Sequence, residues 1–251
     1  NFNERGTNTD LVAERVKKGK SCVVNSIAMC SEIALGCFSL HILLLLYQAV
    51  FLASVLFNSQ TWTRLTKSDL KNLLTIQLKY LKRMMHAPNS TPNVSVFLEL
   101  GVLPITYEID KRKLVFLHHI LTLDLNDPVR RVYYEQLNLP CELNWANELQ
   151  ILRERYEVEL SDNEIMMTSY DSWKSLVKKA VREVAFEELS QEAAMGSKSN
   201  HLRPTELLRQ NYVTSLYPAE ARILFRVRTR TISCKANHKG SYKDLTCRLC
   251  S

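Results

Sequence analysis

Apolar residues recur at intervals of three and four along most of the chain, which is the periodicity of amphipathic α-helices. Between residues 70 and 85, Leu and Met side chains mark one face, which predicts a long helix. Thr66, followed three residues later by Asp69, has the form of a capping box and predicts where this helix begins. A second stripe predicts another long helix and consists of Trp173, Leu176, Val177, Ala180, Val181, Val184 and Leu189.

Capping residues, prolines and glycines mark the limits of the other predicted helices. The predicted helices are one from Thr9 or Asp10 to Gly36, one from Thr91-Pro92 to Gly101, one that begins at Pro104, one over Trp145 to Tyr156, and one after each of Pro204 and Pro218. Residues 126–128 predict a turn, and residues 196–200 predict a flexible linker. The pattern as a whole predicts an all-α fold of helices joined by short turns.

The most apolar stretch runs from Ile42 to Phe57. It is shorter than the ~20 residues that a helix needs to cross a bilayer. Its polar residues, Tyr47 and Gln48, are typical of a helix that is buried on most sides within a fold. We therefore expect a core helix here rather than a membrane span.

The composition agrees with a helical fold and adds a net positive charge. The 251 residues include only 6 Gly and 7 Pro, with 46% hydrophobic residues, which fits one large domain or two small ones. The formal net charge is +7. Such a charge favours an acidic partner, either nucleic acid or an anionic membrane.

Two basic regions are candidates for contact with nucleic acid. In the helix of residues 66–85 the predicted contacts are Lys79, Lys82 and Arg83, placed on the face opposite the leucines. From residue 222 to the end, closely spaced basic residues surround Phe225 and Tyr242, a composition suited to binding phosphates. The predicted contacts in this second region are Arg226, Arg228 and Arg230.

Cys247 and Cys250 have the Cys-x-x-Cys spacing of half a zinc site. Two ligand sets remain open. Either these two cysteines begin a zinc knuckle whose other ligands would follow residue 251, or Cys234 and His238 complete the set within the chain. The chain also starts without an initiator Met, so we expect it to be a piece of a longer protein.

The sequence lacks the common catalytic signatures. It has no glycine-rich phosphate loop, no Gly-x-Ser-x-Gly, no His-Glu-x-x-His, and no Asp-Asp pair that would hold two Mg²⁺ ions. We therefore expect neither a magnesium site nor independent catalysis.

Several segments together resemble the C-terminal part of reverse transcriptases from non-LTR (LINE-type) retrotransposons. The segments are residues 14–19, 28–32, 46–53, 78–83, 97–104 and 242–244, and the terminal Cys-x-x-Cys. The resemblance implies a thumb-like helical bundle over residues 1–87, a helical linker domain over 88–220, and a basic segment with a truncated zinc knuckle over 221–251. It also implies that zinc binding is lost with the missing half of the knuckle.

In that family the thumb and linker hold template RNA and target DNA, so the implied partners are RNA, DNA and their hybrid duplex. The palm, which carries the catalytic metal site, would be supplied by the parent protein. The implied location is a ribonucleoprotein in the nucleus or cytoplasm. Two alternatives remain: a protein-interaction or membrane-associated module anchored by residues 42–57, and a degenerate copy with no role.

Overall fold

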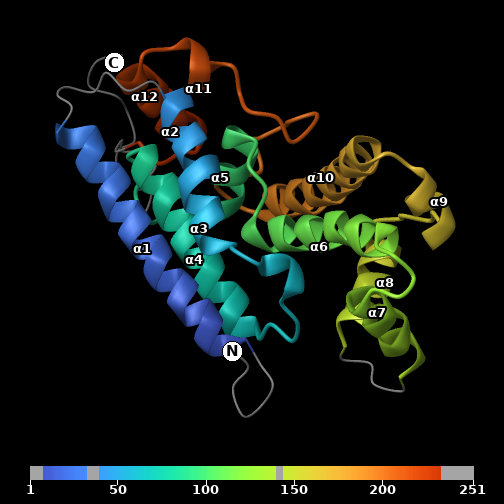
Figure 1. Cartoon of the computed structure of the whole chain (residues 1–251). Coiled ribbons are helices and arrows are strands. Elements are labelled where there is room, and N and C mark those ends of the chain that lie inside the picture. The colour runs from blue at the N-terminus through green and yellow to red at the C-terminus, as the bar shows by residue number, and fades with distance from the viewer. Residues whose placement is uncertain (1–7, 33–39, 140–143, 233–251) are drawn as a thin grey trace, which may run out of the picture.

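The computed structural model describes residues 8–32, 40–139 and 144–232. These ranges are helical, with no strand among them, which confirms the predicted all-α fold (Figure 1). The elements in chain order are α1 (Thr9–Glu32), α2 (Leu40–Leu46), the π-helix η1 (Tyr47–Leu52), α3 (Ala53–Val55), the 3₁₀ turn η2 (Ser59–Thr61), α4 (Lys67–Met84), α5 (Asn93–Leu100), α6 (Ile105–Thr122), α7 (Pro128–Asn138), α8 (Trp145–Arg155), α9 (Asp162–Met167), α10 (Tyr170–Met195), α11 (Tyr212–Ser215) and α12 (Pro218–Arg228).

The first helices form a bundle in which α1 and α4 run side by side in the same direction (Figure 1). Their N-terminal ends are joined because the Asn8 amide donates to the Thr63 carbonyl at 2.7 Å and the Thr9 hydroxyl donates to Asp69 at 3.2 Å. The capping box predicted at the start of α4 is confirmed. Asp69 therefore both caps α4 and contacts the first turn of α1.

The predicted helix of residues 42–57 is confirmed as the continuous run of α2, η1 and α3. Its buried face carries Tyr47 and Phe51, whose rings stack 5.4 Å apart and both contact the ring of Tyr80. The opposite face is exposed at Leu45 and Val50, so the helix is half-buried rather than buried on most sides. Within the described ranges, no helix is both long and apolar enough to span a membrane.

Gln77 of α4 connects this bundle to α6. Its fully buried amide donates to the Tyr47 hydroxyl at 2.7 Å and to the Leu103 carbonyl at 2.8 Å. Its side-chain oxygen accepts the Ile105 N–H at 2.8 Å. One side chain therefore holds η1 and the start of α6 in a fixed relation to α4.

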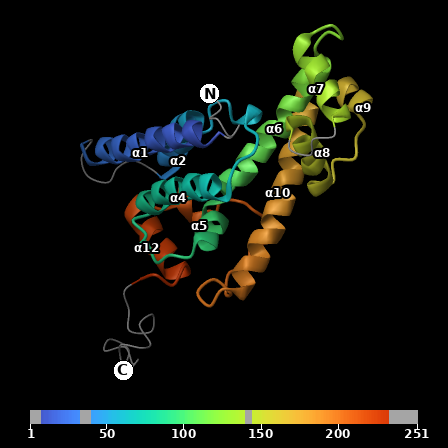
Figure 2. The same cartoon turned by 90° about the horizontal axis from the view of Figure 1, so that it is seen from below.

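Beyond the bundle, the long helices α6 and α10 lie against each other, and α7, α8 and α9 gather at their far end (Figure 2). The Trp173 indole of α10 donates to the Leu114 carbonyl of α6 at 3.0 Å. The predicted α10 stripe is confirmed at Trp173, Val177, Val181 and Leu189, although Leu176 is exposed.

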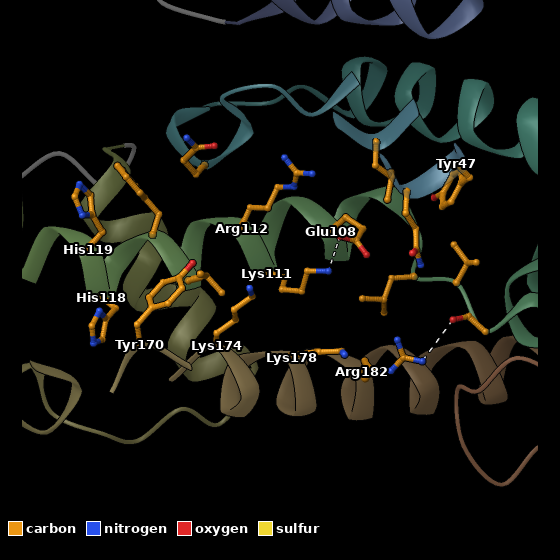
Figure 3. A pocket seen from close by; sticks show the side chains of 18 of the residues that line it. Tyr47, Glu108, Lys111, Arg112, His118, His119, Tyr170, Lys174, Lys178 and Arg182 are labelled. Atoms are coloured by element: carbon orange, nitrogen blue, oxygen red, sulfur yellow. Dashed lines mark hydrogen bonds and ion pairs between the residues drawn. The ribbon is translucent and has the colours of Figure 1, made fainter. Parts of the chain in front are cut away.

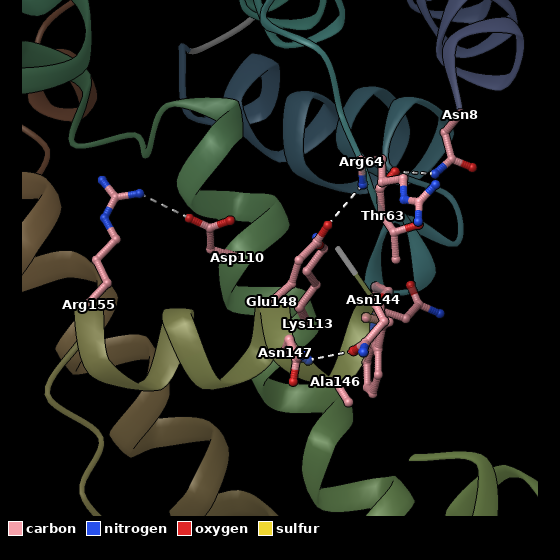
Figure 4. Close-up of polar contacts among 12 residues, drawn as sticks. Asn8, Thr63, Arg64, Asp110, Lys113, Asn144, Ala146, Asn147, Glu148 and Arg155 are labelled. Carbon is pink, nitrogen blue, oxygen red and sulfur yellow. Dashed lines mark hydrogen bonds and ion pairs between the residues drawn. The ribbon is translucent and has the colours of Figure 1, made fainter. Parts of the chain in front are cut away.

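Polar contacts connect α8 to the segment before α4 and to α6 (Figure 4). Glu148 accepts the backbone N–H of Arg64 at 2.9 Å and pairs with Lys113 of α6 at 2.6 Å. At the other end of the chain, Arg222 of α12 donates to the Met84 carbonyl of α4 at 3.1 Å. The C-terminal helices thus return to the first bundle.

One local prediction was confirmed in part, and two were wrong. The turn predicted at residues 126–128 is present, since the Asp127 N–H donates to the Asp124 carbonyl at 2.9 Å, but α7 begins directly after it at Pro128. The stretch after Pro204 is irregular rather than helical. The linker at 196–200 is a packed turn, in which the buried Ser199 hydroxyl donates to the Ala193 carbonyl at 3.0 Å.

Candidate nucleic-acid interface

A cleft of about 930 Å³ lies between α6 and α10, with residues of η1 along its third side (Figure 3). We call it the basic cleft, because six Lys and Arg side chains line it and Glu108 is the one carboxylate among its lining residues in the described ranges. The basic residues are Lys111, Arg112, Lys174, Lys178, Arg182 and Arg209.

Three of these residues, Lys174, Lys178 and Arg182, follow one another at four-residue spacing, and we call them the α10 cations. Four residues of an α-helix rise about 6 Å, so the α10 cations form a row along one face. Trp173 and Val177, each one position earlier, are buried against α6. The register that buries the apolar stripe therefore also places the cations at the edge of the cleft.

The α6 side contributes two basic residues with different partners. Lys111 forms an ion pair with Glu108 at 2.5 Å, which balances its charge. Arg112 donates to the carbonyl of Leu56 at 2.9 Å, where helix α3 ends. Burial lowers the pKa of Arg112 and the nearby Glu108 carboxylate raises it, while its hydrogen-bond partner is an uncharged carbonyl. Because a guanidinium is not deprotonated in proteins, Arg112 keeps a positive charge at the cleft.

The turn between α5 and α6 closes one end of the cleft. Gly101 has a φ of +61°, and a Cβ at this position would collide with the backbone of Arg209. Glycine thus lets the segment around Arg209 lie directly on the turn. Arg182 donates to the carbonyls of Gly101 and Leu207, and Arg209 contacts the His41 ring at 3.3 Å.

The other end of the cleft is lined by aromatic rings. Tyr170 is 47% exposed, and its ring lies edge-on to His118 with centroids 5.8 Å apart. The Lys174 ammonium lies 5.7 Å from the centre of the Tyr170 ring. Phe116 and His119 of α6 lie with ring centroids 5.5 Å apart. A cation and accessible ring faces are therefore close together at this end.

The charge of the cleft is largely unbalanced. Lys178 has no hydrogen-bond or ion-pair partner among the described residues, and Lys174 contacts only a ring there. Arg112, Arg182 and Arg209 bond only to uncharged carbonyls or to a histidine ring. These five residues are the uncompensated cations. Cations of one sign that line a cleft concentrate the field and attract anions.

The residues predicted on α4 have different positions. Lys79 and Arg83 are exposed, but Lys82 is buried, so its placement on the exposed face was wrong. Lys82 lies four residues after Leu78, on the same side of the helix. Its ammonium donates to the Asn89 carbonyl at 2.9 Å, the Thr91 carbonyl at 2.7 Å and the Asn93 side chain at 2.9 Å, and burial lowers its pKa. All three N–H groups are occupied, so Lys82 holds the loop after α4.

The three arginines predicted near the end of the chain, in α12 and just after it, also differ from one another. Arg228 forms two hydrogen bonds to the buried Glu99 carboxylate at 2.8 and 2.9 Å, beside Tyr212, which donates to the same carboxylate at 2.7 Å. Arg226 is half-buried, and its Nε is buried with no partner among the described residues, whereas Arg230 is exposed. None of these three arginines is among the described residues that line the basic cleft.

The proposed zinc ligands Cys234, His238, Cys247 and Cys250 lie outside the described residues. Among the residues that are described, no group of three or more His, Cys, Asp or Glu side chains is arranged to hold a metal ion.

The basic cleft was not predicted from the sequence, although part of its signal was present. The four-residue spacing of the α10 cations places them on one helical face. Which helix would lie opposite that face depends on tertiary packing, because α6 is some fifty residues away in the chain. No protein-family model, curated protein or solved structure matches the chain.

Proposed function

We propose that this chain is a nucleic-acid-binding part of a retrotransposon reverse transcriptase, which holds RNA and DNA without carrying the polymerase palm. The observation that carries the proposal is the basic cleft, where five uncompensated cations face one space. Neutralising backbone phosphates is the main source of affinity in nucleic-acid binding. The family assignment rests on the sequence resemblance alone.

In this proposal an RNA–DNA duplex contacts basic residues outside the cleft, namely the exposed Lys79, Arg83 and Arg230 and the half-buried Arg226. Lys82 and Arg228 are left out because their charged groups are bound within the fold. The protein acts in a ribonucleoprotein of the nucleus or cytoplasm, and catalysis belongs to the palm of the parent protein. Zinc has no part in the proposed binding.

The test is binding of a fluorescent single-stranded RNA and of its RNA–DNA hybrid, measured by anisotropy. Lys178→Glu should weaken binding of at least one of them by about tenfold, because a hydrogen bond to a charged group contributes about 1.5–3 kcal/mol. Lys179→Glu is the matched control, since the neighbouring Lys179 is exposed on another face, near Glu183 at 3.9 Å. Equal losses in the two variants, or no loss in either, would overturn the proposal.

The second candidate is a protein-interaction module. It is favoured by the exposed apolar side chains along the α2–α3 helix, which include Ile42, Leu45, Val50 and Phe57. Under the first proposal this face packs against the palm of the parent protein. If the chain binds neither RNA nor hybrid, and Leu45→Glu abolishes capture of a protein partner, the second candidate replaces the first.

A further inference from the structure

We propose that the basic cleft holds a single strand of nucleic acid, with successive phosphates on the α10 cations and a base against the ring of Tyr170. This inference rests on the proposed function and adds which form of nucleic acid enters the cleft. The duplex, in this view, is bound by the exposed basic residues elsewhere.

The packing of the two walls excludes a duplex from the cleft. Helices α6 and α10 are in direct contact, as the hydrogen bond from Trp173 to the Leu114 carbonyl shows. Axes of packed helices lie about 8–10 Å apart. A double helix of any form is two backbones wide, and the major groove of B-form DNA alone measures about 12 Å. A cleft of about 930 Å³ between such helices has room for a few nucleotides of one strand, but not for both strands.

The row of cations matches the repeat of a single strand. The α10 cations are about 6 Å apart along the helix axis, which is close to the spacing of successive phosphates in an extended strand. All three lie on the side of α10 that faces α6 (Figure 3). Lys178, in the middle of the row, has no partner among the described residues, so its ammonium is available for a phosphate.

One end of the cleft is closed to the strand, and the other end offers a ring on which a base can stack. At one end the turn at Gly101 and the segment around Arg209 close the cleft. At the other end lies Tyr170, a residue that is 47% exposed, with its ring next to Lys174. A cationic track beside an aromatic ring is the combination by which proteins bind single strands with little regard to sequence.

None of the carboxylates of α10 is among the described residues that line the cleft. Glu183 lies near Lys179, and Glu188 bonds to the Tyr107 hydroxyl at 2.6 Å and to Arg155 at 2.8 Å. Glu183 and Glu188 therefore contact groups outside the cleft lining. A strand in the cleft meets one carboxylate among the described lining residues, that of Glu108, which Lys111 already balances.

The test compares a short single-stranded RNA with the hybrid formed by pairing it with complementary DNA, each measured by anisotropy on the full chain. Lys178→Gln should weaken binding of the single strand about tenfold and leave the hybrid unchanged, and Lys179→Gln should change neither. Tyr170→Ala should weaken the single strand by a similar factor, while Tyr170→Phe, which keeps the ring, should not. Circular dichroism of each variant establishes that the helices are retained.

The outcomes separate the inference from the proposed function. If Lys178→Gln weakens the hybrid as much as the single strand, the cleft contacts a duplex surface; the inference then fails while nucleic-acid binding stands. If Tyr170→Ala binds the single strand as tightly as the wild type, the stacking surface is refuted. If the wild type binds neither RNA nor hybrid, the proposed function itself fails.

Discussion

Replacing Gln77 with leucine should destabilise the protein strongly, although the two side chains are similar in size. Gln77 is fully buried, and its amide is the partner of the Tyr47 hydroxyl, the Leu103 carbonyl and the Ile105 N–H. Leucine offers no hydrogen bond to any of them. Because Ile105 and Tyr47 are themselves buried, water does not replace the lost bonds without rearrangement of the fold.

The magnitude follows from the number of groups left without a partner. A buried polar group that loses its hydrogen bond costs about 1–3 kcal/mol. Taking the lower value for each of three groups gives a loss of about 3 kcal/mol in the free energy of unfolding. For a chain of this length the midpoint of thermal unfolding should fall by about 6–12 °C.

Urea denaturation followed by circular dichroism measures this loss, with two control variants. Tyr47→Phe removes one of the three hydrogen bonds and should cost about 1 kcal/mol. Gln191→Leu makes the same exchange at an exposed site of α10 and should change stability by less than about 0.5 kcal/mol. If Gln77→Leu is no less stable than Gln191→Leu, the role given to the buried amide is wrong.

Three further predictions concern the cleft, the turn that closes it, and a carboxylate of α6 outside it. The logarithm of the binding constant for a single strand should fall with the logarithm of the salt concentration, with a slope of about −3.5 for five phosphate contacts. Neutralising the three α10 cations should reduce this slope to about −1.4. An unchanged slope would place the phosphate contacts elsewhere. Gly101→Ala should lower the free energy of unfolding by about 1–2 kcal/mol, because of the positive φ at this position alone. It should also weaken RNA binding, because the added Cβ displaces the backbone of Arg209. Unchanged affinity for RNA would contradict this prediction. Burial raises the pKa of Asp110, so ionising this carboxyl costs folding stability as the pH rises just above the ordinary pKa of aspartate. Asp110→Asn keeps an acceptor for the Tyr156 hydroxyl, and its unfolding free energy should rise relative to that of the wild type across that pH range. A fall in this free-energy difference with rising pH would refute the assignment.

Local signals in the sequence were enough to predict most of the helices. The capping box of Thr66 and Asp69 and the left-handed Gly101 after α5 depend on neighbouring residues, so they can be read without knowing the fold. The start of α7 depended on a local signal too, but Asp127-Pro128 is compatible with either a turn or a helix N-terminus. Such ambiguity comes from the shared geometry of turns and first helical turns.

Charged residues were harder to place, because a side chain's charge does not determine its partner. Lys82 and Lys178 look alike in the sequence, each in a basic helix near apolar residues. Lys82 is bound by the carbonyls of a loop that folds over it, whereas Lys178 faces a cleft and has no described partner. The difference arises from contacts with segments elsewhere in the chain.

Packing between α6 and α10 explains how the basic cleft persists in a stable fold. Like charges in a row repel one another, and repulsion along one helix costs stability. Here the row lies on the helix that also carries the buried stripe of Trp173, Val177 and Val181, so packing against α6 holds the cations in place despite their repulsion. A bound phosphate chain would relieve that repulsion. The structure therefore predicts that RNA raises the unfolding temperature of the wild type, and raises it less when the α10 cations are replaced by glutamine.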